Sequence, residues 1–345
     1  MKHEFTYELT SEILAEIQFF CQELSEFSIF QNPVLLRALY PDRKICLCTC
    51  RSKGHLVAYA LIAERHRRAS VFLGPVVKND SYFSSIVLAI AAHYHKKNYG
   101  ELIVQPPLLE NDSHIEKIAL GKFKIIQGNQ YFNWATLIVE LGKEDGEIAA
   151  QFRENHRRSI KKSLDLGMKV EPIESRAGAL QLATLHDRMY QMKGLKKEVD
   201  QTKKVYSDLL TIFQNEPNLG FFLGVYLDKE LIGGVVNLCS GNRCCYKFGI
   251  SDQTQKKFPV LHLGIYESMK EAKKRGFNYY DLWGYSKVGE NKDQLARINH
   301  FKLGFTKNIV DYPLSMHLML NPFVNALLQS ALYLRKAFQS KNSGN

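Results

Sequence analysis

Apolar and polar positions follow the same order in two stretches of the chain: two strand patterns, a helical pattern and a further strand. In the first stretch these segments are residues 55–62, a strand that ends at Gly74, residues 86–97 and residues 101–105. In the second they are residues 230–237, a strand that ends at Gly249, residues 261–275 and residues 277–281. The offset between the copies stays constant to within one residue. We therefore expect an α/β protein with mixed sheets, built from one unit used twice, although this order also occurs in unrelated proteins.

The repeat predicts two domains, residues 1–145 and 146–311, divided at a polar turn at 142–146. A length of 345 residues also exceeds the usual size of one hydrophobic core. The last stretch contains an amphipathic helical pattern at 322–338, and we expect the segment 312–345 to pack on the first domain. A membrane-surface role for this helix stays open.

Between the two copies lies a basic helical pattern at 151–167. Phe152, His156, Ile160 and Leu164 form one apolar stripe, and the other faces carry five basic residues: Arg153, Arg157, Arg158, Lys161 and Lys162. A solvated charged face and a site for a phosphate-rich ligand such as a nucleic acid are both compatible with this pattern.

The composition points to an anionic partner and to a cytoplasmic protein. The chain has 46 basic and 35 acidic residues, a formal charge of +11. Seven cysteines without zinc-ligand spacing indicate reduced core thiols, so we expect no metal site. The N-terminus lacks the apolar core of a signal peptide, and no run is long enough to span a bilayer.

The most site-like segment is the strand at 277–281 and the residues after it. Asp281 and Trp283 end this strand, and Lys302 follows in the last turn of a short helix that Gly304 caps, beside Phe301. A lysine between aromatic walls is partly desolvated, so its charge can stabilise an oxyanion or bind a phosphate. We expect Lys302 to be catalytic, Asp281 to accept a proton, and Trp283 and Phe301 to contact substrate.

Several nucleotide and hydrolase motifs are absent from the sequence. It has no glycine-rich dinucleotide loop, no P-loop, no nucleophile elbow and no zinc-protease motif. The segment at 255–264, where an acetyl-coenzyme A enzyme with this strand order would hold the pyrophosphate, lacks closely spaced glycines.

Four segments resemble the Fem-type peptidyltransferases, tandem acetyltransferase-like (GNAT-like) proteins that build peptidoglycan cross-bridges. These are Phe30-Gln-Asn-Pro33, the end of the basic helix at 166–170, Tyr279-Tyr-Asp-Leu-Trp-Gly284 and Phe301-Lys-Leu-Gly-Phe305. The resemblance covers most of the chain, and it implies two GNAT-like acyl-N-acyltransferase domains. It also implies transfer of an aminoacyl group from aminoacyl-tRNA to an amine of a muropeptide or lipid-linked precursor, with no cofactor and with possible contact to the inner membrane surface.

The resemblance also assigns roles to individual residues. Lys302 takes the place of the family lysine that stabilises the transition state, and Arg37 falls where a basic residue holds the phosphates of the precursor. Tyr246 and Phe248 fall on a strand whose aromatic residues line the cleft, and Lys193 replaces a family arginine.

Two departures from the family keep other hypotheses open. Where family members have an acidic residue, suspected of catalysis, on a strand of the first domain, this chain has Gln105. The long helical hairpin that some members use to bind tRNA is not evident in the sequence. An acyl-coenzyme A-dependent N-acyltransferase acting on an amino sugar or another envelope component is therefore the main alternative, and a non-catalytic binding protein is a third.

Overall fold

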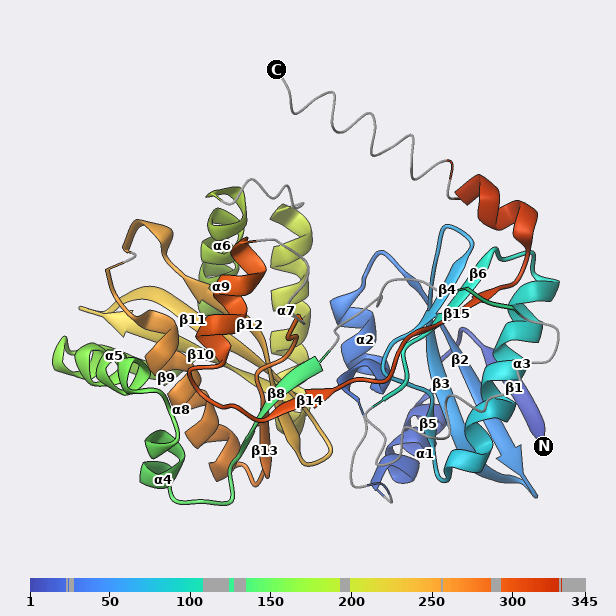
Figure 1. The fold of residues 1–345 in the computed structure, drawn as a ribbon, viewed down its shortest axis with the longest axis horizontal. Coiled ribbons are helices and arrows are strands. Elements are labelled where there is room, and N and C mark those ends of the chain that lie inside the picture. Colours follow the sequence, from blue (N-terminus) through green and yellow to red (C-terminus); the bar gives the residue numbers. More distant parts are fainter. Residues whose placement is uncertain are drawn as a thin grey trace. The chain divides into compact units, whose positions relative to one another are not determined.

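The computed structural model describes residues 1–22, 24, 28–107, 124–126, 135–192, 199–255, 257–286, 293–328 and 330. The chain forms two compact units (Figure 1). The first unit combines Met1–Phe132 with Tyr312–Asn345, and the second unit is Asn133–Asp311.

In the described part of the first unit, the strands form one mixed sheet in the order β1-β2-β3-β4-β6-β15-β7, with β5 paired to β3. The strands are β1 (Lys2–Thr6), β2 (Lys44–Ser52), β3 (His55–Arg65), β4 (Arg68–Val71), β5 (Val76–Val77), β6 (Glu101–Val104), β7 (Lys124–Ile126) and β15 (Met316–Met319). The helices are α1 (Ser11–Gln22), α2 (Pro33–Leu39) and α3 (Phe83–Lys96), with short 3-10 turns at Ile29–Gln31 and Asp80–Tyr82.

The described strands of the second unit form a sheet in the order β14-β8-β13-β12-β11-β10-β9. They are β8 (Ala135–Glu140), β9 (Lys169–Pro172), β10 (Gly220–Leu227), β11 (Glu230–Ser240), β12 (Arg243–Ser251), β13 (Tyr279–Asp281) and β14 (Ile309–Asp311). The helices are α4 (Asp145–Ala150), α5 (Glu154–Asp165), α6 (Arg176–Met192), α7 (Val199–Asn215), α8 (Val260–Lys274) and α9 (Asp293–Lys302), with 3-10 turns at Pro217–Leu219 and Gln253–Gln255.

The sheet pairings confirm the predicted repeat. In the first unit β3 pairs antiparallel with β4, and β4 pairs parallel with β6 after the crossover helix α3. In the second unit β11 pairs antiparallel with β12, and β12 pairs parallel with β13 after the crossover helix α8. Two antiparallel strands, a helix and a parallel strand therefore occur once in each unit, as the apolar pattern predicted.

Each sheet also contains a strand from outside its repeat, and this moves the domain boundary. Strand β8 pairs antiparallel with β13, and strand β15 pairs antiparallel with β6. The boundary expected between residues 145 and 146 lies after β8, whereas the structure places β8 in the second unit because its backbone hydrogen bonds go to β13 and β14. Tyr312–Asn345 belongs to the first unit, where β15 pairs with β6 and β7.

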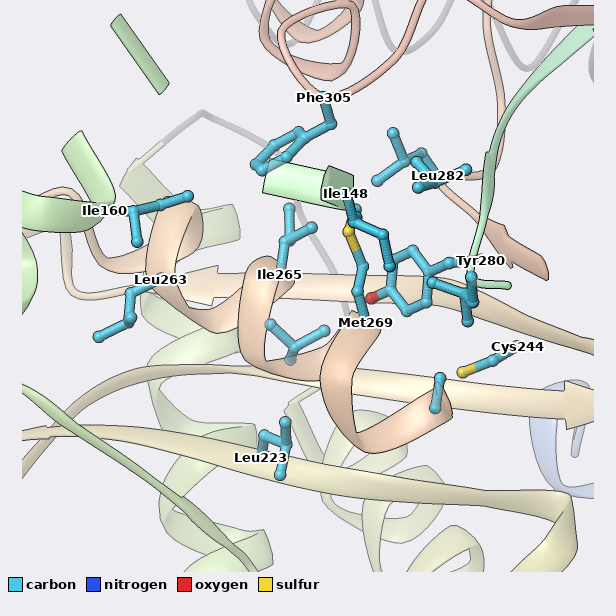
Figure 2. Close-up of a cluster of buried hydrophobic side chains, with 14 of the residues drawn as sticks. Ile148, Ile160, Leu223, Cys244, Leu263, Ile265, Met269, Tyr280, Leu282 and Phe305 are labelled. Atoms are coloured by element: carbon cyan, nitrogen blue, oxygen red, sulfur yellow. The ribbon is translucent and has the colours of Figure 1, made fainter. Parts of the chain in front are cut away.

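Helices cover both faces of the sheet in the second unit. Leu223 of β10 lies in the cluster formed with α8, while its neighbour Phe222 stacks on Tyr206 of α7, with ring centroids 5.6 Å apart. Successive strand residues point to opposite faces, so α8 and α7 cover opposite faces of the sheet. Figure 2 shows Leu263 and Met269 of α8 in this cluster together with Phe305, which follows α9.

Helices in the part of the chain that the structure describes are all too short or too polar to cross a membrane. Residues 322–328 form the described part of the expected C-terminal helix. This helix lies on Gly100, where an added Cβ would come within 3.0 Å of the Asn325 backbone nitrogen. Phe323 and Leu327 are exposed, and the remainder of the expected helix lies outside the described residues.

Gln105 ties the C-terminal segment to the end of β6. Its Nε2 donates to the Pro313 carbonyl at 3.0 Å, and its Oε1 accepts from Ser315 Oγ at 2.5 Å. The side chain is fully buried. Gln105 therefore has a structural role in the first unit, which explains why an amide suits this position.

We predict that Gln105→Glu destabilises the protein by about 1–3 kcal/mol, because a carboxylate cannot donate to Pro313 and would be buried beside a carbonyl oxygen. Urea unfolding followed by circular dichroism measures the change. Gln151→Glu, on an exposed side chain, is the matched control and should leave the midpoint nearly unchanged. Equal midpoints for both variants would contradict this role of Gln105.

Candidate active site

The loop after β13 is shaped by Asp281. Trp283 adopts a left-handed backbone conformation with φ +60°, which is uncommon for a residue other than glycine. Asp281 Oδ1 accepts a hydrogen bond from the Trp283 backbone N–H at 2.7 Å and another from the Thr136 hydroxyl. Arg243 lies 3.5 Å from the other carboxylate oxygen. These contacts hold the strained turn in place.

This turn presents two carbonyl groups to Lys302. The ammonium of Lys302 donates to the Trp283 carbonyl at 2.6 Å and to the Gly284 carbonyl at 2.8 Å. The side chain is only 7% exposed, and burial lowers its pKa to about 8, with Asp281 acting in the opposite direction. Within the part of the chain that the structure describes, two of the three ammonium protons are bound to the protein, which leaves the third for a ligand.

Lys302 lines a cavity of about 690 Å³ in the second unit. Its walls include the aromatic residues Tyr190, Tyr246, Phe248 and Phe301 and the basic residues Lys247 and Arg297. None of the described residues that line the cavity carries a carboxylate. The cavity therefore suits a ligand with planar or apolar groups and negative charge.

The predicted residues Lys302, Phe301, Tyr246 and Phe248 meet in this cavity, whereas Asp281 and Trp283 do not line it. Asp281 lies behind the loop and is 1% exposed, with its oxygens directed at Trp283, Thr136 and Arg243. The geometry thus gives no support to Asp281 as the proton acceptor. It supports a role in shaping the carbonyl pair that binds Lys302.

Sequence reasoning missed His186, which also lines the cavity. His186 is 1% exposed, and its Nδ1 lies 2.9 Å from the hydroxyl of Tyr206 on α7. Its ring is 4.7 Å from that of Tyr190, one turn later on α6, and 5.1 Å from that of Phe248. A histidine and a tyrosine four residues apart on one helix were the available signal.

A smaller cavity of about 380 Å³ shares lining residues with this one and is also lined by residues of the basic helix α5. It is lined by Ser159 and Lys162 of α5 and by Lys257 and the residues that begin α8. Ser251, Leu261 and Phe301 line both cavities. Basic residues of α5 therefore reach the neighbourhood of Lys302.

Most of the predicted basic residues of α5 are exposed. Arg157, Arg158, Lys161 and Lys162 face solvent, and Arg153 is half-buried at the start of the helix. The predicted apolar stripe is wrong at Leu164, which is 53% exposed, while Ser163 is buried. A step of four residues drifts by about 40° on an α-helix, so a fourth position on such a stripe leaves the core.

Two other predicted residues are not among the residues that line this cavity in the part of the chain that the structure describes. Arg37 is an exposed residue of α2 in the first unit, where its guanidinium donates to the Tyr7 carbonyl at 3.2 Å. Lys193 lies outside the described residues.

Residues 150–294 match the family model described as an acetyltransferase (GNAT) domain. This match covers most of the second unit, Asn133–Asp311, which is therefore similar to GNAT-type acetyltransferase domains. No curated protein matches the sequence significantly.

Solved structures extend the GNAT assignment to the fold of both units. The chain is similar to the structure of FemX, with a TM-score of 0.78, 14% identity, and coverage of 95% of this chain and 99% of that one. The C-terminal domain of a putative lysylphosphatidylglycerol synthetase from Agrobacterium fabrum gives a TM-score of 0.59 at 11% identity, with 94% and 97% covered. A tandem GNAT protein from the clavulanic acid biosynthesis pathway gives 0.55 at 10% identity, with 93% and 99% covered. Two tandem GNAT-like units thus account for the whole fold.

We predict that Asp281→Asn lowers the pKa of Lys302 below about 8, because the substitution removes a negative charge that stabilises the ammonium. The asparagine Oδ1 can still accept from Trp283, so the loop is retained. An NMR titration of lysine side chains, with Lys302 assigned from Lys302→Met, measures the shift. Asp145→Asn, which removes a partner of Lys273, is the control, and an unchanged Lys302 titration in Asp281→Asn would contradict the electrostatic link.

Proposed function

We propose that the protein transfers an aminoacyl group from aminoacyl-tRNA to an amine of a peptidoglycan precursor peptide. The observation that carries this proposal is the buried Lys302 ammonium, held by two carbonyls in an aromatic cavity. The Fem-type motifs around Asp281 and Lys302 and the fold shared with FemX support it.

The chemistry required is aminolysis of an ester. The acceptor nitrogen attacks the ester carbonyl carbon, a C–N bond forms, the C–O bond to the ribose breaks, and the amine proton leaves with the ribose oxygen. The carbonyl oxygen becomes an oxyanion in the tetrahedral intermediate. The third proton of the Lys302 ammonium would stabilise that oxyanion, an effect worth about 3 kcal/mol for one well-placed donor.

The exposed basic face of α5 supports a polyanionic donor. Arg158, Lys161 and Lys162 face solvent, and Lys162 also lines the smaller cavity that shares three residues with the Lys302 cavity. A tRNA backbone lying on α5 would deliver its aminoacylated end towards Lys302 by this route.

The acceptor side of the proposal depends on the first unit. The exposed Arg37 would bind the phosphates of a muropeptide or lipid-linked precursor, as the Fem-type resemblance implies. We place this reaction in the cytoplasm, and the exposed Phe323 and Leu327 would support peripheral contact with the inner membrane surface.

A second candidate function is acyl-coenzyme A-dependent N-acylation of an amino sugar or another envelope component. The smaller cavity at the start of α8 favours it, because Lys162, Lys257 and a helix N-terminus could hold a pyrophosphate. The absence of glycine from 252–263 restricts close approach of the backbone to phosphate and favours the first candidate.

One experiment separates the two donors. The purified protein is incubated with lipid-linked muropeptide and either charged tRNA or acyl-coenzyme A, and the products are measured by mass spectrometry. We expect a mass gain only with charged tRNA. A gain only with acyl-coenzyme A would reject the first candidate in favour of the second.

The pKa of Lys302 predicts the pH dependence of the reaction. The cationic form is present below a pKa of about 8 and is lost as the pH rises through that value, so kcat should fall on the alkaline side. Lys302→Met should reduce kcat by about 10²-fold or more without unfolding the protein. Single-turnover rates across pH 6–10 test both points, and a rate that keeps rising above pH 9 would contradict the requirement for the cationic form of Lys302.

We also predict that Arg158→Glu, Lys161→Glu and Lys162→Glu together weaken tRNA binding and reduce its salt dependence, because phosphate contacts release counterions. A charge-matched control replaces the exposed Lys204, Lys229 and Lys274 with glutamate. Filter binding at several salt concentrations measures both sets. Equal losses in the two variants would indicate a non-specific effect of net charge.

A further inference from the structure

The buried His156 connects α5 to the helix that carries Lys302. Its Nε2 lies 2.8 Å from the carbonyl oxygen of Phe301, the residue before Lys302. A carbonyl oxygen can only accept, so Nε2 carries the proton and donates. His156 is 2% exposed, so a buried side chain on α5 makes this hydrogen bond to the end of α9.

The bond falls at the end of α9, where a helix leaves its last carbonyl groups without partners inside the helix. The Phe301 carbonyl also accepts from the Gly304 N–H at 3.0 Å, and the Lys302 carbonyl accepts from Phe305 N–H at 3.0 Å. From the other side, Arg153 N–H donates to the Gly304 carbonyl at 2.8 Å. Two hydrogen bonds from the first residues of α5 thus hold the turn that contains Lys302.

The packing of this turn explains why residue 304 is glycine. A Cβ at Gly304 would lie 2.0 Å from Cε1 of His156, so any side chain there would displace the ring. Gly304 does not have a left-handed backbone, and the cap expected from the sequence is instead a space for His156. The ring also packs on Phe305, at a centroid distance of 4.7 Å, and on His262, at 4.6 Å.

We infer that His156 is a positioning residue that holds the last turn of α9 so that the Lys302 ammonium stays on the Trp283 and Gly284 carbonyls and faces the cavity. This inference rests on the catalytic role proposed for Lys302. Lys302 and Phe301 are adjacent, so movement of the Phe301 carbonyl rotates the base of the Lys302 side chain. A displacement of about 1 Å at a reacting group can lower a rate by about 10²-fold.

The test compares two substitutions of His156 in the full-length protein. His156→Leu removes the donor and keeps an apolar side chain, and we expect kcat to fall between about 10-fold and 10²-fold with KM nearly unchanged. His156→Gln can place an amide N–H near the position of Nε2 and should recover most of kcat. Thermal unfolding of each variant shows whether the fold is retained.

A matched control separates positioning from loss of stability. His95 in the first unit makes the same kind of bond, with Nδ1 2.7 Å from the Leu320 carbonyl. His95→Leu removes this bond from a half-buried side chain and should leave kcat unchanged, whatever its effect on the unfolding temperature. If both leucine variants lose activity in proportion to stability, or if His156→Leu has wild-type kcat, the positioning role is overturned.

Two further variants complete the design. Gly304→Ala should lower kcat in the same way as His156→Leu, because its Cβ occupies the place of the ring, and wild-type kcat in Gly304→Ala would contradict the inference. Lys302→Met in the same assay distinguishes the two proposals. Full activity of Lys302→Met would remove the catalytic role of Lys302 on which this inference rests, and no transfer by the unmodified protein would reject the proposed function, whereas an inactive Lys302→Met with an unaffected His156→Leu would reject only the positioning role.

Discussion

The second unit is organised around one buried cation. Removing the Lys302 ammonium from water costs several kcal/mol unless the protein supplies hydrogen bonds, and here the carbonyls of Trp283 and Gly284 supply two. The turn that presents those carbonyls contains Trp283 in a left-handed backbone conformation, and Asp281 stabilises that conformation by accepting from the Trp283 N–H. The strained turn, the buried carboxylate and the lysine therefore depend on one another, and the cavity is formed beside them.

The two copies of the repeat use corresponding positions in the same way. Gln105 follows β6 and binds the segment at Pro313 and Ser315, while Asp281 ends β13 and binds Thr136 and the Trp283 N–H. In both units, a buried polar side chain lies at the end of the strand that follows the crossover helix. It binds a segment from another part of the same unit. The hydrogen-bond partners explain why one position is glutamine and the other aspartate. Asp281 contacts only donors, whereas Gln105 must also donate to a carbonyl.

The sequence predicted the repeat and the position of Lys302, because apolar periodicity and a lysine between aromatic residues are local signals. It did not predict that β8 belongs to the second unit, since pairing with β13 joins residues that are far apart in the chain. The same limit applies to the site. His186 enters the cavity from α6, and Asp281 turns away from the cavity because Thr136 and Trp283 lie on its other side. Pairing of β8 with β13 and the bond from Thr136 to Asp281 join residues far apart in the chain, and such contacts leave no pattern in a single sequence.

Helix α5 has a buried face that packs in the core and an exposed face that carries positive charge. The buried face contributes His156, Ile160 and Ser163, while the exposed face contributes Arg158 and Lys161. A polyanion bound to the exposed face would bring its phosphates to a helix whose first residues hold the turn of Lys302. The positive charge of the protein then does more than attract polyanions in general. Part of it lies on α5, which also supports the Lys302 ammonium proposed to act in the transition state.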